Sequence, residues 1–372
     1  MVKFIKSLKK TNRDTSMDVL RIICCVFIIL LHTSGHLDLN SKLWRIIQAI
    51  VRPALWTFMA LTGYFIFRKP IDNYFKFWFK HILGLIIPVT IYLAALHVFY
   101  NRTLIGFDPF VFIKGDSLGH LWYVYSLIQI YLLAPFLQKM YEGLNKKQLL
   151  LLICAFLIIS RGIKILANFG LTIGFSTNII EDCCLFYVTL GYYLYKYPIK
   201  LTKKFLIYII SIINTFALYY ASGKNFLVPN LYTLSFGMAI GVVCYITIFD
   251  QSKNLIKDRL NKLKKIIGSI CSFIGKRTYG IYIAHIPVFQ YLTNKSIFQL
   301  SQNSSVENVK ILALETITIF IISLVVSIIL DGTVVFIVKW LLFKLYDFLE
   351  ESILKLKQMN KNREQLKYKT NI

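Results

Sequence analysis

Apolar runs long enough to cross a lipid bilayer recur along the whole of this chain. About 20 predominantly apolar residues in a helix span a hydrocarbon core of roughly 30 Å. Runs of this kind lie near residues 17–35, 46–67, 77–99, 120–137, 148–167, 182–196, 205–221, 230–249, 272–291 and 315–340. Because 56% of the 372 residues are hydrophobic and only 16% are charged, the composition excludes a soluble domain. The pattern predicts an all-α integral membrane protein, built as a single bundle of about ten transmembrane helices.

The 43 Lys and Arg residues, which give a formal net charge of +25, are unevenly distributed. Alternating spans place most of them on one side of the membrane, in segments 1–16, 67–80, 138–148, 195–204, 250–277 and 339–372. Cytoplasmic loops carry such an excess, so both termini are predicted to be cytoplasmic. Membrane topology and attraction to anionic lipid account for the basic charge. The lipid bilayer is therefore the expected partner, and nucleic acid is not.

The predicted organisation is simple. Residues 1–16 form a basic cytoplasmic tail, residues 17–345 form the transmembrane domain, and residues 346–372 form a charged cytoplasmic helix or tail. The first apolar run is too long for a signal peptide and lacks a small-residue cleavage site. Seven cysteines lie in or beside apolar segments without a CxxC spacing, which favours a role as small core residues. Any chemistry must therefore take place within the membrane domain or through a partner.

Two polar residues interrupt the first span. Arg21 and His32 are eleven residues apart, which is about 20° more than three full helical turns and about 16 Å along the axis. They therefore share one side of the helix, with Arg21 near the cytoplasm and His32 deeper. Such residues usually face a bundle interior and serve function. The structural alternatives are that Arg21 reaches the headgroups while pairing with Asp18, and that His32 is a satisfied interior histidine.

Other polar or aromatic positions in the spans are candidates for substrate binding. They are Arg52, Tyr64, His120, Trp122, Arg161, Tyr282, His285 and Asp331. Trp122 also fits an ordinary belt of interfacial aromatic residues. Asp331 lies deep in the last span, where a carboxylate needs a partner or a proton, so we expect it to face the bundle interior. His32 and His36 have the i, i+4 spacing of a metal pair, but no Asp, Glu or Cys cluster accompanies them, so no metal site is predicted.

Four segments resemble the acyltransferase-3 family of membrane proteins. "LRIICCVFIILLH" matches the family's arginine–ten residues–histidine signature on the first span. "FMALTGYFIF", "HLWYVYSLIQIYLLAPFL" and "TYGIYIAHIPVF" are similar to three further family segments, in the family's order. The resemblance covers residues 17–340. It departs from the family where Ile286-Pro287 replaces histidine-proline, and in a sparse set of acidic residues.

This resemblance implies transfer of an acyl group, with acetyl expected, from acyl-coenzyme A to a hydroxyl of a cell-envelope glycan or similar acceptor. The chain is similar to stand-alone bacterial members of the family, which lie in the plasma membrane and modify surface polysaccharides. The resemblance implies acetyl-CoA as a substrate and no bound cofactor. A homo-oligomer is compatible with it. The chemistry fits, because a histidine is the usual base for a hydroxyl proton and an arginine suits the phosphates of a cytoplasmic donor. His32 and Arg21 are thus the predicted catalytic residues.

Two other classes of function fit the same residues. A transporter or flippase for a glycan or small molecule would use the intramembrane charges along its path, although no inverted repeat supports it. A membrane sensor without catalytic activity is the third reading, and the Arg21–His32 pair argues against it.

Overall fold

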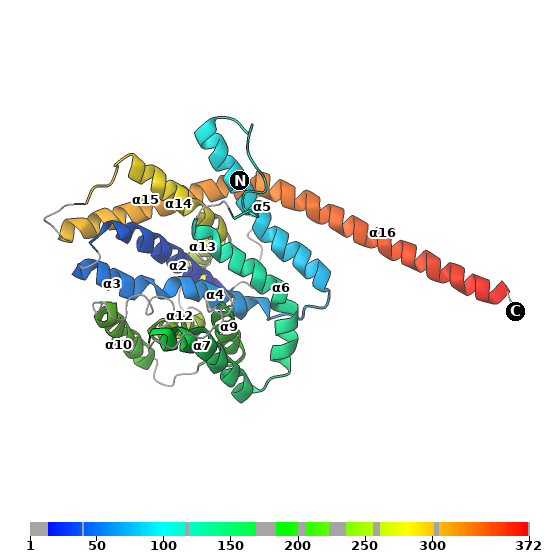
Figure 1. Ribbon diagram of the computed structural model, residues 1–372, viewed down its shortest axis with the longest axis horizontal. Coiled ribbons are helices and arrows are strands. Elements are labelled where there is room, and N and C mark those ends of the chain that lie inside the picture. Colours follow the sequence, from blue (N-terminus) through cyan, green and yellow to red (C-terminus); the bar gives the residue numbers. More distant parts are fainter. Residues whose placement is uncertain are drawn as a thin grey trace. The chain divides into compact units, whose positions relative to one another are not determined.

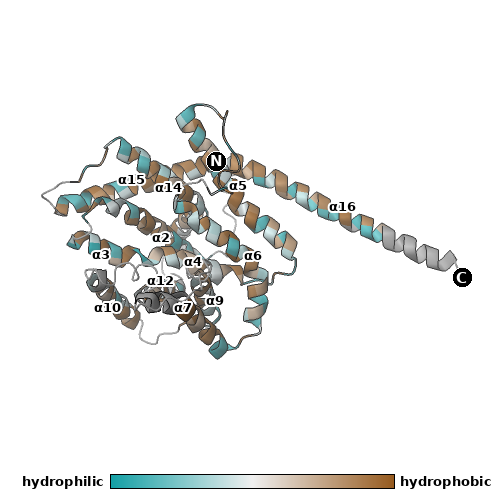
Figure 2. Ribbon diagram, viewed as in Figure 1, coloured by the Kyte–Doolittle hydropathy of each residue, from teal (hydrophilic) through white to brown (hydrophobic). Residues whose placement is uncertain are grey.

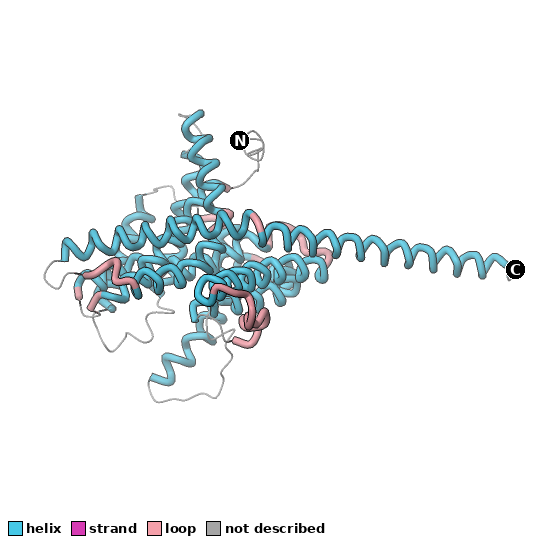
Figure 3. Tube along the Cα trace, turned by 90° about the horizontal axis from the view of Figure 1, so that it is seen from above, coloured by secondary structure: helices cyan, strands magenta, loops and turns pink. Residues whose placement is uncertain are grey.

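The structure is a computed structural model that describes residues 14–38, 41–115, 119–168, 184–199, 205–222, 236–255, 261–300 and 305–370. Every regular element in these ranges is a helix (Figures 1 and 3). The elements are α2 (Thr15–Thr33), η1 (Ser34–His36), α3 (Lys42–Val51), α4 (Pro53–Ile66), α5 (Tyr74–Asn101), η2 (Gly119–Leu121), α6 (Trp122–Glu142), α7 (Lys146–Asn168), α9 (Cys184–Lys196), α10 (Phe205–Ser222), α12 (Phe236–Leu255), α13 (Asn261–Gly275), α14 (Thr278–Asn294), α15 (Ser305–Gly332) and α16 (Val334–Thr370). The all-α prediction is confirmed for the described residues.

Five segments in the described part of the chain are long and apolar enough to cross a membrane. They are Thr15–His36, Lys42–Ile66, Tyr74–Asn101, Gly119–Glu142 and Val306–Met359. Shorter apolar helices lie at Phe205–Tyr220, Gly237–Asp250 and Ile266–Gly275. Figure 2 shows apolar residues along α10 and a mixture of apolar and hydrophilic residues along α16. The fold is that of an all-helical membrane protein, and the number of ten crossings stays a prediction.

Three of the predicted spans are each divided between two helices. Residues 46–67 fall on α3 and α4, residues 272–291 on α13 and α14, and residues 315–340 on α15 and α16. The first division has a clear cause, because Pro53 has no N–H to donate and begins α4 as its first residue. Capping contributes at other helix starts, where Asp14 accepts from the backbone N–H of Met17 and Ser41 from that of Trp44.

Contacts divide the helices into two compact units. The first contains residues 1–74 and 118–328, and the second contains residues 75–117 and 329–372. Each unit is described separately. The predicted domain boundaries at residues 17 and 345 stay a prediction.

In the first unit, α4 and α9 pack with their backbones in contact. A Cβ on Gly63 would overlap the carbonyl of Val188, and a Cβ on Gly191 would overlap the carbonyl of Ala60. Small residues allow transmembrane helices to approach this closely, which gains van der Waals contact without a hydrophobic driving force in lipid. Gly63 of the "TGY" segment is thus explained by packing.

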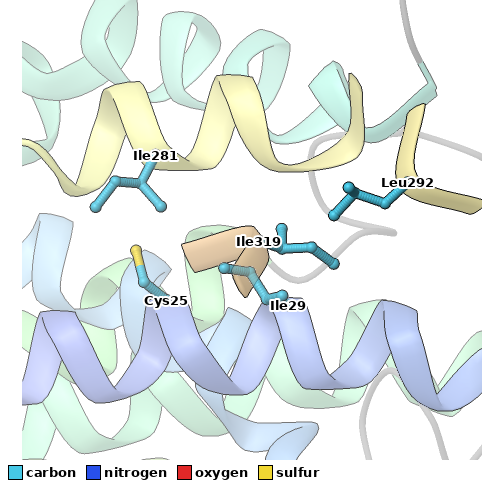
Figure 4. Close-up of a cluster of buried hydrophobic side chains, with 5 residues drawn as sticks. All are labelled: Cys25, Ile29, Ile281, Leu292 and Ile319. Atoms are coloured by element: carbon cyan, nitrogen blue, oxygen red, sulfur yellow. The ribbon is translucent and has the colours of Figure 1, made fainter. Parts of the chain in front are cut away.

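Helix α2 lies at the centre of the first unit and contacts α3, α4, α12, α13 and α14. Figure 4 shows one of its interfaces, where Cys25 and Ile29 face Ile281 of α14 and Ile319 of α15. The Cys25 thiol donates to the backbone oxygen of Thr278 at 3.6 Å. These contacts bury one face of α2 and hold α14 beside it.

In the second unit, α5 and α16 form an antiparallel pair. The Lys76 ammonium lies 2.6 Å from the Glu350 carboxylate, and the Phe79 ring stacks on that of Tyr346 at 4.4 Å. Further along α5, Tyr92 donates a hydrogen bond to Asp331 at 3.1 Å. Residue numbers in α5 increase along these contacts while the numbers of their partners decrease, so the two segments run antiparallel.

Candidate active site

Three imidazole rings from three different elements meet in the first unit. The ring of His285 on α14 lies 5.3 Å from that of His32 on α2 and 5.2 Å from that of His120 in η2, between centroids. His285 is therefore close to both of the other rings. Separately predicted candidates, far apart in sequence, thus form one group, which we call the histidine cluster (His32, His120 and His285).

The register between α2 and α14 brings His32 and His285 together. Cys25 contacts Thr278, and each histidine follows the corresponding contact residue by seven positions. Seven residues are about two helical turns, so the two histidines return to the same faces two turns further along. This correspondence requires the two helices to run in the same direction.

Backbone contacts orient the rings of His120 and His285. Nδ1 of His285 lies 2.5 Å from the carbonyl oxygen of Tyr282, and Nε2 of His120 lies 3.3 Å from that of Ile283. The Tyr282 hydroxyl in turn donates to the carbonyl oxygen of His120. The predicted residue Tyr282 therefore ties η2 to α14, and its ring lies 5.4 Å from that of Tyr123.

The other nitrogen of each of these two rings is buried and has no hydrogen-bond partner among the described residues. These atoms are Nδ1 of His120 and Nε2 of His285, and the whole of His285 is only 1% exposed. A buried polar atom left unpaired costs about 1–3 kcal/mol. A buried atom of this kind calls for an explanation, such as a catalytic role or a bound water or ion.

A second group of predicted residues lies at the other end of α2. The Arg21 guanidinium forms a 3.0 Å ion pair with buried Asp18 and lies 4.2 Å above the ring of Phe65. The alternative pairing expected from the i, i+3 spacing is thus present. Tyr64 is next to Phe65, and its hydroxyl donates to the Asp250 carboxylate at 2.7 Å.

Comparison with known families assigns the chain. The family described as an acyltransferase domain, acyltransferase-3, matches residues 14–332. The chain belongs to the acyltransferase-3 family. The protein is accordingly an acyltransferase of the membrane, as the resemblance of the four segments implied. Searches of curated proteins and of solved structures give no significant match.

Two further predicted residues of this acyltransferase, Arg52 and Trp122, lie outside the histidine cluster. Arg52 donates to Gln48 at 2.6 Å, and Gln48 donates to Ser34 at 3.0 Å. Trp122 lies between the rings of Trp56 and Tyr123, 6.2 Å from each, and is 37% exposed. Arg52 and Trp122 thus lie in the same unit as the cluster, and the contacts described here are with other residues than its three histidines.

The last two candidates are Asp331 and Arg161. Asp331 belongs to the second unit of the acyltransferase, where it accepts from Tyr92 and interacts with the charge of Lys339. That Asp331 faces the bundle interior stays a prediction. The side chain of Arg161 lies outside the described residues. In the described part of the chain, no three His, Cys, Asp or Glu side chains are arranged to hold a metal ion.

Sequence reasoning missed Arg68, which was counted only among the cytoplasmic charges. Its guanidinium lies 4.3 Å from the ring of Phe65, 4.5 Å from that of Tyr64 and 4.9 Å from that of Tyr195. Arg21 and Arg68 therefore share the ring of Phe65. Arg68 lies in the turn that follows α4, where its Nε donates to the carbonyl oxygen of Tyr64 at 3.2 Å.

Proposed function

We propose that this acyltransferase moves an acyl group, with acetyl expected, from acyl-coenzyme A to a hydroxyl of a cell-envelope glycan or similar acceptor in the bacterial plasma membrane. The observation that carries the proposal is the meeting of three imidazoles on the side of α2 that also carries Arg21. Acyl transfer to an alcohol needs a proton acceptor, and histidine is the residue most often used. We propose His32 for this role.

The reaction balances with these groups. The acceptor oxygen attacks the thioester carbonyl carbon, a carbon–oxygen bond forms, and the carbon–sulfur bond breaks. The hydroxyl proton passes to the imidazole of His32 and from there to the thiolate of coenzyme A. His32 thus ends each cycle neutral and needs no further reactant.

Arg21 is proposed to bind the phosphates of the donor. A guanidinium offers five N–H groups in a fixed fork that suits phosphate, and the Asp18 pair leaves the Arg21 side chain 21% exposed. Arg68 adds a second guanidinium at the same aromatic ring. Along α2, Arg21 and His32 are about 16 Å apart, so a donor with its phosphates at Arg21 must be extended to present its thioester at the cluster.

The directions of the helices support the predicted topology. Helices α2 and α14 run in the same direction, as the first and ninth of ten alternating spans must. Thr33 hydrogen-bonds Thr316 at 3.1 Å, and the later residue His36 lies 3.8 Å from the earlier residue Glu315. Helix α15 therefore runs against α2, as the tenth span must.

The test is donor-dependent labelling. Purified protein, radiolabelled acetyl-CoA and envelope glycan are incubated, and the parent is compared with His32→Ala, Arg21→Ala and Arg21→Lys. Folded yield, coenzyme A binding and labelled product are measured on each protein. His32→Ala should lose product and keep donor binding. Arg21→Ala should weaken donor binding, and Arg21→Lys should restore only part of it, because a point charge replaces the fork.

The matched control is His97→Ala, which removes a histidine of the second unit and should leave transfer unchanged. Normal product formation by folded His32→Ala would end the assignment of His32. Equal losses of folded yield in all site variants would indicate a structural role. Loss of glycan export without donor-dependent labelling by the parent would favour the transporter.

A further inference from the structure

The tautomers of His120 and His285 follow from their backbone contacts. A carbonyl oxygen only accepts hydrogen bonds, so the ring nitrogen facing it must carry the hydrogen. Nδ1–H of His285 therefore donates to Tyr282, and Nε2–H of His120 donates to Ile283. In a neutral imidazole the opposite nitrogen then carries a lone pair. Those lone pairs are on Nε2 of His285 and Nδ1 of His120.

Both lone pairs are buried, and no N–H or O–H of the residues that the structure describes reaches them. They belong to rings that lie 5.2 Å apart at an angle of 81°, and the ring of His285 also contacts that of the proposed base, His32. Two buried lone pairs on neighbouring rings repel phosphate and carboxylate groups. They favour an uncharged group that brings hydrogen-bond donors of its own.

We propose that Nε2 of His285 and Nδ1 of His120 accept hydrogen bonds from the acceptor substrate, at an O–H or N–H next to the hydroxyl that is acylated. This inference rests on the proposed function. The two histidines hold the substrate and keep their protons, while His32 takes the proton of the reacting hydroxyl. The protein then selects an acceptor with neighbouring donors over a simple alcohol, since a simple alcohol leaves a buried lone pair unsatisfied.

The amide N–H groups of the donor's pantetheine arm have the same chemistry. We assign the acceptor because the reacting thioester end of the donor carries no N–H or O–H. If the donor's phosphates lie at Arg21, its pantetheine arm extends towards the histidine cluster. The amides then lie along this arm, and the thioester lies at the end of the arm that reaches the cluster. The two sources predict different kinetics. If the lone pairs bind the acceptor, their loss should raise the KM for the acceptor. If they bind the donor's amides, their loss should raise the KM for acetyl-CoA.

The experiment uses two small probes with the full chain. Transfer from acetyl-CoA to cis-1,2-cyclohexanediol is compared with transfer to cyclohexanol, as kcat/KM per hydroxyl. The parent should prefer the diol by at least about tenfold, as expected for one hydrogen bond. His285→Phe and His120→Phe keep a flat ring without the lone pair and should lose this preference. His285→Gln should retain part of it, because its amide oxygen accepts. His97→Phe is the matched control and should behave as the parent.

Three results would overturn the inference. The first is an equal kcat/KM for the diol and the mono-alcohol in the parent. The second is acylation of envelope glycan with neither small probe acylated. The third is a raised KM for acetyl-CoA in the Phe variants with the diol preference intact, which would assign the lone pairs to the donor's amides. A parent that labels no acceptor at all would instead refute the proposed function, and the inference with it. The parent comparison needs no variant, so misfolding of His285→Phe does not affect it.

Discussion

His32 and His285 face each other two helical turns beyond the contact between Cys25 and Thr278, on the same pair of parallel helices. The Cys25 thiol is 3% exposed, and Thr278 is 7% exposed. A small side chain at position 25 therefore permits the close approach that sets the register. The position of the proposed base relative to its neighbours thus depends on packing well away from the chemistry.

Enlarging residue 25 should disturb this register. We expect Cys25→Leu to lower the free energy of unfolding by about 1–3 kcal/mol, as overpacking of a buried site does, and to reduce acyl transfer more than donor binding. Thermal unfolding in detergent and product formation are the measurements. Cys154→Leu is the control, because Cys154 is exposed. Equal effects of the two substitutions would contradict the assigned role of Cys25.

Adding a methyl group between α4 and α9 should be costly. Gly63→Ala and Gly191→Ala each place a Cβ against a backbone carbonyl, and backbone moves less readily than a side chain. We expect a loss of at least about 1–3 kcal/mol in each case. Gly84→Ala in α5 is the comparison, since nothing lies within 4 Å of its added Cβ. It should be neutral or stabilising by up to about 1 kcal/mol. Unchanged melting of Gly63→Ala would show that the helices separate easily.

The bond between Tyr92 and Asp331 should stabilise the second unit. Hydrogen bonds to a charged group contribute about 1.5–3 kcal/mol, so Tyr92→Phe should lower stability by that order. A double-mutant cycle with Asp331→Asn measures the coupling. Tyr208→Phe, at an exposed tyrosine, should have little effect. A coupling energy near zero would indicate that the carboxylate depends on Lys339 rather than on Tyr92.

The connection after α5 should loosen in acid. Hydrogen bonds from the Lys114 ammonium and the Phe110 N–H lower the pKa of Asp108 below its usual value. Because the pKa is lower in the folded state, ionised Asp108 stabilises this segment at neutral pH. That contribution is lost as the pH falls below about 4 and through the lowered pKa. Pepsin cleavage of the parent, relative to Asp108→Asn at each pH, should rise from about pH 4 to pH 2. A constant ratio would refute the prediction.

Reporter fusions test the topology. Alternating spans with both ends in the cytoplasm place Asn40, Gly170 and Asn303 outside and Asn145 inside. Fusions at the first three positions should give the outside signal, and the fusion at Asn145 the inside signal. An outside signal at Asn145 would overturn the order of the spans. Folded yield of each fusion serves as the control.

The sequence by itself determined the class of protein and most of the candidate residues. Apolar run length predicts helices because an isolated backbone in lipid must satisfy its own hydrogen bonds. The angular spacing of Arg21 and His32 depends only on helical geometry, so their shared side could be derived without coordinates. Their polar or aromatic character within apolar spans singled out His120, Tyr282 and His285, although it gave no distances between them.

Tertiary structure alone decided which of these residues meet. The register that pairs His32 with His285 depends on the contact of Cys25 with Thr278, residues far apart in the sequence, and no periodicity within one helix contains it. The lone pairs on His120 and His285 likewise follow from carbonyls of α14. Local patterns report which face of a helix is polar. Only the packing of one helix on another fixes which polar groups share a site, because that choice depends on volumes and hydrogen bonds contributed by both.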